Sequence, residues 1–349
     1  MMVMIRSFQG LRFVFISLIV FSHLVSGFDF GGDCGVAFFF MLSGFILSYV
    51  YSGKIISSNL TSVRLVVHQL KKFYPLYIVM LVAMLLINMA AGKSINILAV
   101  LADVLLLQSW YPANAVTFYL NGPAWFLSDI MFCYAVFVPF YKLIHQKSLG
   151  RLAVILISSL FVYFFINSLV PTDKVNDIIY TNPLLRLYDF VIGILLHRLY
   201  YSHPSISLQK RLSKNKALLL FIELFIIAFF LFIILLYHWL PARIHSAVLF
   251  WPLMAVIIFF FLILEKQRDR YTVVTNILSL PLLVRLGGIS MEMFLIQNFV
   301  ITLLSSAVRH ARIEYNEYSI AFIVSCYLLI IFFAFAAKKV SVSFFNKQL

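Results

Sequence analysis

QGLRFVFISLIVFSHLVSG, residues 9–27, is apolar over a length that spans a bilayer, yet it carries Arg12 and His23 eleven residues apart. Eleven residues of an α-helix return the chain to within roughly 20° of its starting direction, so both side chains share one face. They lie about 16 Å apart along the axis, or about half the thickness of a bilayer core. This spacing predicts a ligand that enters from one membrane surface and meets a proton-transfer group at mid-depth.

The composition excludes an ordinary soluble domain. The chain of 349 residues is 63% hydrophobic and 11% charged, with a mean hydropathy of +1.01. We therefore expect an all-α, polytopic integral membrane helix bundle with ten transmembrane helices. The expected spans lie near 9–27, 34–53, 74–91, 124–142, 152–170, 180–200, 217–237, 246–264, 282–307 and 318–337. The apolar stretch 96–110 is interrupted by Asp103, which predicts a short re-entrant or interfacial helix; the alternative is an eleventh span.

Basic residues are distributed unevenly between the two sets of loops. If the N-terminus is cytoplasmic, most of the 27 Lys and Arg residues fall in inside segments, as the positive-inside rule requires. The pattern predicts an even number of spans and both termini in the cytoplasm. Topology and contact with anionic lipid then account for the net charge of +14 without a nucleic-acid partner.

The chain is expected to form a single transmembrane domain over residues 1–349, with no fused soluble domain. The basic start and the small residues Ser26 and Gly27 resemble a signal peptide, but cleavage would reverse the charge bias of every loop. We therefore expect the first segment to remain as a span. The three cysteines have no metal-binding spacing and are interpreted as apolar fillers, with no metal site.

A glycine-rich segment joins the first two spans. Gly31, Gly32 and Gly35 permit a tight hairpin between packed helices. Alternatively, their backbone N–H groups are directed toward an oxyanion, as at a helix N-terminus. The sequence leaves both interpretations open.

Several motifs follow Arg12 and His23 in a fixed order. They are GGDCGVAFFFMLSGF at 31–45, KFYPLY at 72–77, PAWFLS at 123–128, RLYDFVIG at 186–193 and LGGISMEMFLI at 286–296. Together they resemble the membrane-bound acyltransferase 3 family, which includes bacterial O-acetyltransferases of cell-surface sugars. The resemblance covers essentially the whole chain.

The chain departs from the family pattern at three places. Gln297 stands where the family has a second His, and an amide cannot shuttle a proton at neutral pH. The family's acidic residue after the Trp segment is missing from its usual place, although Asp129 lies close by. Lys72 replaces an Arg, which keeps the charge but loses the bidentate fork.

The resemblance implies transfer of an acyl group from cytoplasmic acyl-coenzyme A to a hydroxyl on the far side of the membrane. Arg12, Lys71 and Lys72 are then expected to bind the phosphates of the donor. His23 is expected to act as general base, or alternatively as an acyl carrier. Acetyl-coenzyme A would be a donor substrate, and no permanently bound cofactor is expected.

Other polar residues within the spans are candidates for binding the acceptor. Trp125 either stacks on a sugar ring or anchors the helix at the membrane surface. Arg186 either pairs with Glu292 or contacts substrate. The full set of candidate substrate-binding residues is Trp125, Asp129, Arg186, Glu292 and Gln297. A polar and aromatic outer mouth is expected from Asp29, Asp33, Trp110, Tyr111, Tyr119 and Asn121.

These features predict an O-acyltransferase, most simply an O-acetyltransferase, in the bacterial cytoplasmic membrane. Its acceptor would be a cell-surface polysaccharide or the lipid-linked precursor of one. The alternative is a non-catalytic transporter or flippase of lipid-linked sugar, in which His23 would be structural. A polysaccharide polymerase is less consistent, because such enzymes typically have a large external loop. The sequence does not predict an oligomeric state.

Overall fold

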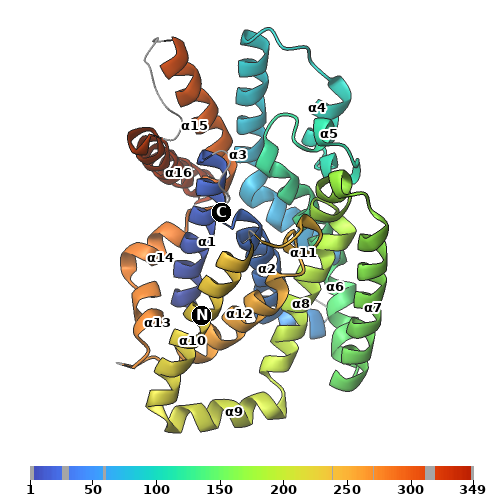
Figure 1. Ribbon diagram of the computed structural model, residues 1–349, viewed down its shortest axis with the longest axis vertical. Coiled ribbons are helices and arrows are strands. Elements are labelled where there is room, and N and C mark those ends of the chain that lie inside the picture. The colour runs from blue at the N-terminus through green and yellow to red at the C-terminus, as the bar shows by residue number, and fades with distance from the viewer. Residues whose placement is uncertain are drawn as a thin grey trace.

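The computed structural model describes residues 4–25, 31–57, 60–237, 239–269, 271–310 and 319–346, with side chains to residue 340. Within these residues all regular structure is helical (Figure 1), which confirms the expected all-α class. Among the described residues, nine helical stretches are long and apolar enough to cross a membrane. They are α1 (Arg6–Leu24), α2 (Gly32–Ile56), α3 (Ser62–Ala90), α6 (Trp125–Gln146) with the turn η2 (Gly122–Ala124) before it, α7 (Leu149–Leu169), α10 (Lys216–Tyr237), α12 (Phe250–Lys266) with α11 (Ala242–His245) before it, α15 (Ser290–His310) and α16 (Ile320–Asn346).

One more span was expected near 180–200, and it corresponds to α8 (Pro183–Tyr200). This helix is too polar to count among the nine because it contains Arg186, Asp189 and Arg198. It nevertheless packs tightly against α2, since a Cβ on Gly44 would overlap the carbonyl oxygen of Phe190. Close backbone contact through small residues is the usual means of helix association in membranes.

The expected span 282–307 is wrong as a single helix. The structure divides it into α14 (Pro281–Gly287) and α15, with a break at residues 288–289. Gly287 packs directly on the backbone of Gln9, where a Cβ would overlap the carbonyl oxygen. The break places the first turn of α15 beside α1, so Ser290 reaches Arg12.

The apolar stretch 96–110 forms α4 (Ile97–Val104) and the 3₁₀ turn η1 (Gln108–Trp110). Eight residues of helix cover only about 12 Å, far less than a bilayer core of about 30 Å. The competing eleventh span is therefore not formed. The third span also begins earlier than expected, because the Thr61 hydroxyl caps α3 by accepting the backbone N–H of Arg64.

Helices α1 and α2 occupy the centre of the bundle, between two buried apolar clusters (Figure 1). One cluster is formed mainly with α3, α6, α15 and α16, and the other mainly with α10 and α12. Helix α1 contacts α2, α12, α14 and α15. Much of α1 is therefore buried inside the bundle, while some positions such as Val14 stay exposed.

Candidate active site

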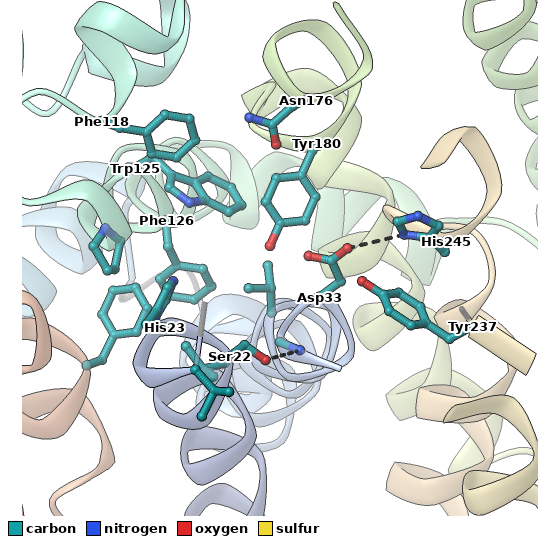
Figure 2. A pocket seen from close by; sticks show the side chains of 16 residues that line it. Ser22, His23, Asp33, Phe118, Trp125, Phe126, Asn176, Tyr180, Tyr237 and His245 are labelled. Carbon is teal, nitrogen blue, oxygen red and sulfur yellow. Dashed lines mark hydrogen bonds and ion pairs between the residues drawn. The ribbon is translucent and has the colours of Figure 1, made fainter. Parts of the chain in front are cut away.

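A large cavity lies where the C-terminal end of α1 meets the N-terminal end of α2. Its volume is about 570 Å³, within the usual range for small-molecule sites. The start of α6, the π-helical turn η4 (Asn176–Tyr180) and the ends of α10 and α11 (Ala242–His245) also reach it. Figure 2 shows the polar and aromatic side chains that line it, among them Ser22, His23, Asp33, Trp125, Tyr180 and His245.

His23 lies in the last turn of α1 with its ring exposed to this cavity. Its Nδ1 is 3.1 Å from Oε1 of Gln297, and the Gln297 amide donates its Nε2–H to the carbonyl oxygen of Phe294 at 3.1 Å. Because the amide oxygen faces the ring, Nδ1 carries the proton and donates. In this neutral tautomer Nε2 is the unprotonated nitrogen, as a general base requires.

Arg12 faces a second, smaller cavity of about 30 Å³. Its Nε donates to the Ser290 hydroxyl at 3.1 Å, and its Nη1 donates to Oε1 of Gln9 at 3.4 Å. Both of these hydrogen-bond partners are uncharged, and the charge of Arg12 interacts with the carboxylate of Glu292. The break between α14 and α15 supplies one of these two partners.

The two cavities adjoin one another. Ile19, Phe126 and Phe294 line both of them. The rings of Phe126 and Phe294 meet edge to face at 5.3 Å, and all three side chains are buried. Arg12 and His23 therefore line adjoining cavities along α1. The three apolar residues between the cavities are called the neck.

Cations and one carboxylate gather around Arg12. Lys72 interacts electrostatically with Arg12 and Lys338, and Lys338 donates to Glu292 at 2.9 Å. Lys338 was not among the residues expected at the site, so this member of the cluster was missed. Lys71 is exposed on α3, and among the described residues no contact joins it to Arg12.

The expectation that Arg186 pairs with Glu292 is wrong. Arg186 is fully buried and donates from Nη1 to Asp189 at 3.3 Å. It also donates to the carbonyl oxygens of Tyr180 at 2.6 Å and Ser246 at 2.7 Å, and Asp189 accepts from Trp251. With these three bonds the guanidinium braces the backbone behind the cavity rather than facing into it.

The remaining candidates separate into two groups. Trp125 lines the cavity, with its ring 5.8 Å from the Arg186 guanidinium. Asp129 is fully buried and is not among the residues that line the cavity. Gln297 contacts His23, and Glu292 accepts a hydrogen bond from Lys338.

The expected outer mouth is only partly formed. Asp33 lines the cavity, whereas Asn121 instead donates to the backbone of Leu295 and Tyr119 donates to the backbone of Ser94. Trp110 and Tyr111 are exposed side chains of the α4–α5 region, where α5 is Asn114–Thr117. Asp29 lies outside the described residues. The sequence analysis missed Phe118, Asn176, Tyr180, Tyr237 and His245, which lie at the ends of helices.

In the glycine-rich connection between α1 and α2, residues 26–30 lie outside the described residues, so only the α2 side bears on its two interpretations. Gly31 adopts a φ of 84°, the left-handed region that favours glycine. Gly32 donates its N–H to the Ser22 hydroxyl at 3.1 Å, and Gly35 donates to the Gly31 carbonyl at 3.3 Å. A Cβ on Gly35 would lie 2.7 Å from the Ile19 side chain. The backbone N–H groups of Gly32 and Gly35 are thus used within the protein.

The fold and the site together define a multi-pass membrane helix bundle with a polar and aromatic cavity inside it. Residues 5–338 match the family model of the acyltransferase domain called acyltransferase 3, and the chain belongs to this family of acyltransferases.

One curated relative supports the same class. The chain is similar to the acyltransferase MdmB of Streptomyces mycarofaciens, with 29% identity over 182 residues. The match covers 47% of this chain and 46% of that protein, so less than half of the relative's length is matched. No solved structure matches the chain.

Proposed function

We propose that this protein is a membrane O-acyltransferase, most simply an O-acetyltransferase, with acyl-coenzyme A as donor. The acceptor is a hydroxyl of a cell-surface polysaccharide or of its lipid-linked precursor, on the far side of the bacterial cytoplasmic membrane. The observation that carries the proposal is the placement of His23. Its ring faces the large cavity while Gln297 holds Nδ1 in the donor role.

The chemistry follows from that tautomer. The acceptor oxygen attacks the thioester carbonyl while Nε2 of His23 removes the hydroxyl proton. The carbon–sulfur bond then breaks, and the coenzyme A thiolate leaves and takes up a proton. A positioned general base contributes about 10²–10⁴-fold to such a reaction. Acyl transfer through His23 itself is the alternative route.

The donor would enter from the end of the bundle where Arg12 lies. Arg12, Lys72 and Lys338 concentrate positive charge there with Glu292 as the nearby carboxylate. These groups suit the phosphates of coenzyme A, and Lys71 would add charge at the surface. The thin pantetheine arm would extend through the neck and bring the thioester to His23.

Labelled acetyl-coenzyme A tests the proposal directly. The purified protein in lipid nanodiscs is mixed with the membrane glycolipid and surface-glycan fraction of its source organism, and transfer of the label is measured. We expect transfer by the wild type and a loss of at least about 100-fold in His23→Ala. The matched control is His203→Ala, on the exposed start of α9 (His203–Lys214), with wild-type transfer expected.

Two results would contradict the proposal. Full transfer by a folded His23→Ala protein would show that His23 is not the general base. Absence of transfer by the wild type, together with passage of intact lipid-linked sugar across the bilayer, would indicate the transporter instead.

A further inference from the structure

The cavity has two chemically different walls (Figure 2). His23 lies beside the aromatic rings of Phe118, Trp125 and Phe126. Across from it, Asp33 points toward His245, with the hydroxyl groups of Tyr180 and Tyr237 nearby. The reaction proposed above uses the first wall and assigns nothing to the second.

Asp33 and His245 come from distant parts of the chain. Asp33 lies in the first turn of α2, and His245 ends α11. Oδ2 of Asp33 is 3.6 Å from Nδ1 of His245, which is longer than a hydrogen bond. The side chains keep 18% and 23% of their surface exposed, so both reach the cavity, whereas Nδ1 of His245 is itself buried and has no hydrogen-bond partner among the described residues.

The ring of His245 is held in place by its neighbour. Its centroid is 4.5 Å from that of Tyr237 in an edge-to-face arrangement, and Tyr237 is itself buried at the end of α10. An edge-to-face pair of this kind fixes the orientation of both rings. The second wall is therefore a constructed surface rather than a chance meeting of loop side chains.

Asp33 is the carboxylate on this side of the cavity, and among the described lining residues there is no Lys or Arg. The charge of Asp33 interacts with that of Arg186, which does not line the cavity. Arg186 lies behind Tyr180, 4.5 Å from the centre of its ring, and its three nitrogens donate to protein groups. An anionic ligand beside Asp33 would thus meet repulsion with no accessible guanidinium or ammonium to offset it.

We propose that Asp33 and His245 form the acceptor subsite, which binds the hydroxyl groups of an uncharged saccharide ring and excludes acceptors with a carboxylate or phosphate at that position. This inference rests on the proposed acyl transfer and adds the class of acceptor to it. Asp33 accepts hydrogen bonds from ring hydroxyls, which are stronger when the acceptor is ionised. The apolar face of the ring packs on the aromatic wall, and the hydroxyl to be acylated points toward His23.

The size of the discrimination follows from Coulomb's law. Two like charges a few ångströms apart repel each other more strongly at a protein surface than in bulk water, because the effective dielectric constant is lower there. We therefore expect selectivity against an anion of at least about tenfold.

The test uses pairs of glycosides that differ only by one carboxylate. Methyl β-D-glucopyranoside is compared with methyl β-D-glucuronide, and the corresponding galactoside is compared with its uronide. Each is added as an inhibitor of acetyl transfer to the glycolipid and glycan fraction. With the wild type, we expect the better neutral glycoside to inhibit at a concentration at least tenfold lower than its anionic partner.

The Asp33→Asn variant should reduce this difference to less than about threefold. It should also raise KM for the natural acceptor roughly tenfold while KM for acetyl-coenzyme A stays unchanged, because the donor binds at the other cavity. His245→Gln should raise the same acceptor KM. The matched control is Asp173→Asn in the exposed turn η3 (Thr172–Lys174), for which no change is expected.

The outcomes distinguish this inference from the proposed function. Equal inhibition by neutral and anionic glycosides, or inhibition by neither, overturns the acceptor subsite while acetyl transfer itself stands. Unchanged selectivity and acceptor KM in Asp33→Asn, with an unfolding midpoint like that of the wild type, overturn it as well. If the wild type transfers no acetyl group to any fraction, the proposed function fails and this inference fails with it.

Discussion

His23 and Gln297 are joined by a hydrogen bond of 3.1 Å between Nδ1 and Oε1, across 274 residues of sequence. The amide is itself oriented by its bond to the carbonyl oxygen of Phe294. Gln297 occupies the place where the family pattern has a histidine. The amide cannot transfer a proton, but its oxygen can accept a hydrogen bond from Nδ1, which favours the tautomer that the proposed general base requires.

Replacing Gln297 with Leu should slow acyl transfer without weakening substrate binding. The variant leaves Nδ1 of His23 without this acceptor and frees the ring to change tautomer. Losing one such hydrogen bond costs about 1–3 kcal/mol, which corresponds to roughly a 5- to 150-fold fall in kcat. Steady-state kinetics with labelled acetyl-coenzyme A measure it, with both KM values expected near those of the wild type. An unchanged kcat would show that the bond does not position the imidazole.

The positions of Arg12 and His23 on α1 could be predicted from spacing alone, because both lie on the one helix and helical geometry is local. The partners could not. Gln297 and Ser290 reach α1 only because the chain breaks between α14 and α15, and that break depends on the packing of Gly287 against Gln9. Such a contact between distant segments leaves no periodic pattern in the sequence.

For charged residues within apolar segments, too, the sequence predicted one part of the structure and not another. Hydropathy predicted that Arg186 and Glu292 must have partners, since an unpaired charge is costly in a membrane. It did not identify the partners. The partner of Arg186 is Asp189, three residues further along the same helix, whereas the partner of Glu292 is Lys338 on α16. His245 was missed for another reason. It lies in a short helix beyond the end of a span, where apolar periodicity carries no information.

A larger side chain in the neck should block transfer while leaving donor binding intact. In Ile19→Phe the added ring would lie between Phe126 and Phe294. We expect acetyl transfer to fall at least tenfold with an unchanged dissociation constant for coenzyme A. The control is Val14→Phe, an exposed position on the same helix.

Overpacking costs about 1–3 kcal/mol in its own right, so the unfolding midpoint of each neck variant is measured alongside its activity. Normal transfer by Ile19→Phe would mean that the acyl group reaches His23 by another path. Loss of coenzyme A binding together with activity would also contradict the prediction, because Arg12 and Lys72 lie on the other side of the neck.

Breaking the pair between Arg186 and Asp189 should destabilise the bundle. Asp189→Ala leaves a fully buried guanidinium without its carboxylate, which costs about 3–5 kcal/mol. Replacing both residues together, as Arg186→Met with Asp189→Leu, should be less destabilising than Asp189→Ala alone. Denaturant unfolding in detergent compares the two variants with Asp173→Ala, an exposed control. Equal stability of Asp189→Ala and the wild type would contradict the assignment.

The stability of the protein should depend on the ionisation of Asp103 in α4, outside the nine spans. Burial raises the pKa of Asp103 to about 7, against a smaller opposing effect of a hydrogen bond from the backbone of Leu120. Oδ2 of this side chain has no hydrogen-bond partner among the described residues. The folded state therefore favours the protonated acid, whereas the unfolded chain ionises near the ordinary value of 3.8.

Between these two pKa values the folded protein binds more protons than the unfolded chain, so the contribution of Asp103 to stability falls as pH rises from about 4 to about 7. Above pH 7 the loss is constant, at up to about 4 kcal/mol, because each pKa unit corresponds to about 1.36 kcal/mol. Asp103→Asn removes the charge at every pH, so its advantage over the wild type should be larger at pH 8 than at pH 5 by about 2–3 kcal/mol. Denaturant unfolding at the two pH values measures this difference, with Asp173→Asn as the exposed control. An advantage that is equal at both pH values would mean that Asp103 is already ionised in the fold at pH 5, and that its burial is compensated by a cation or by water.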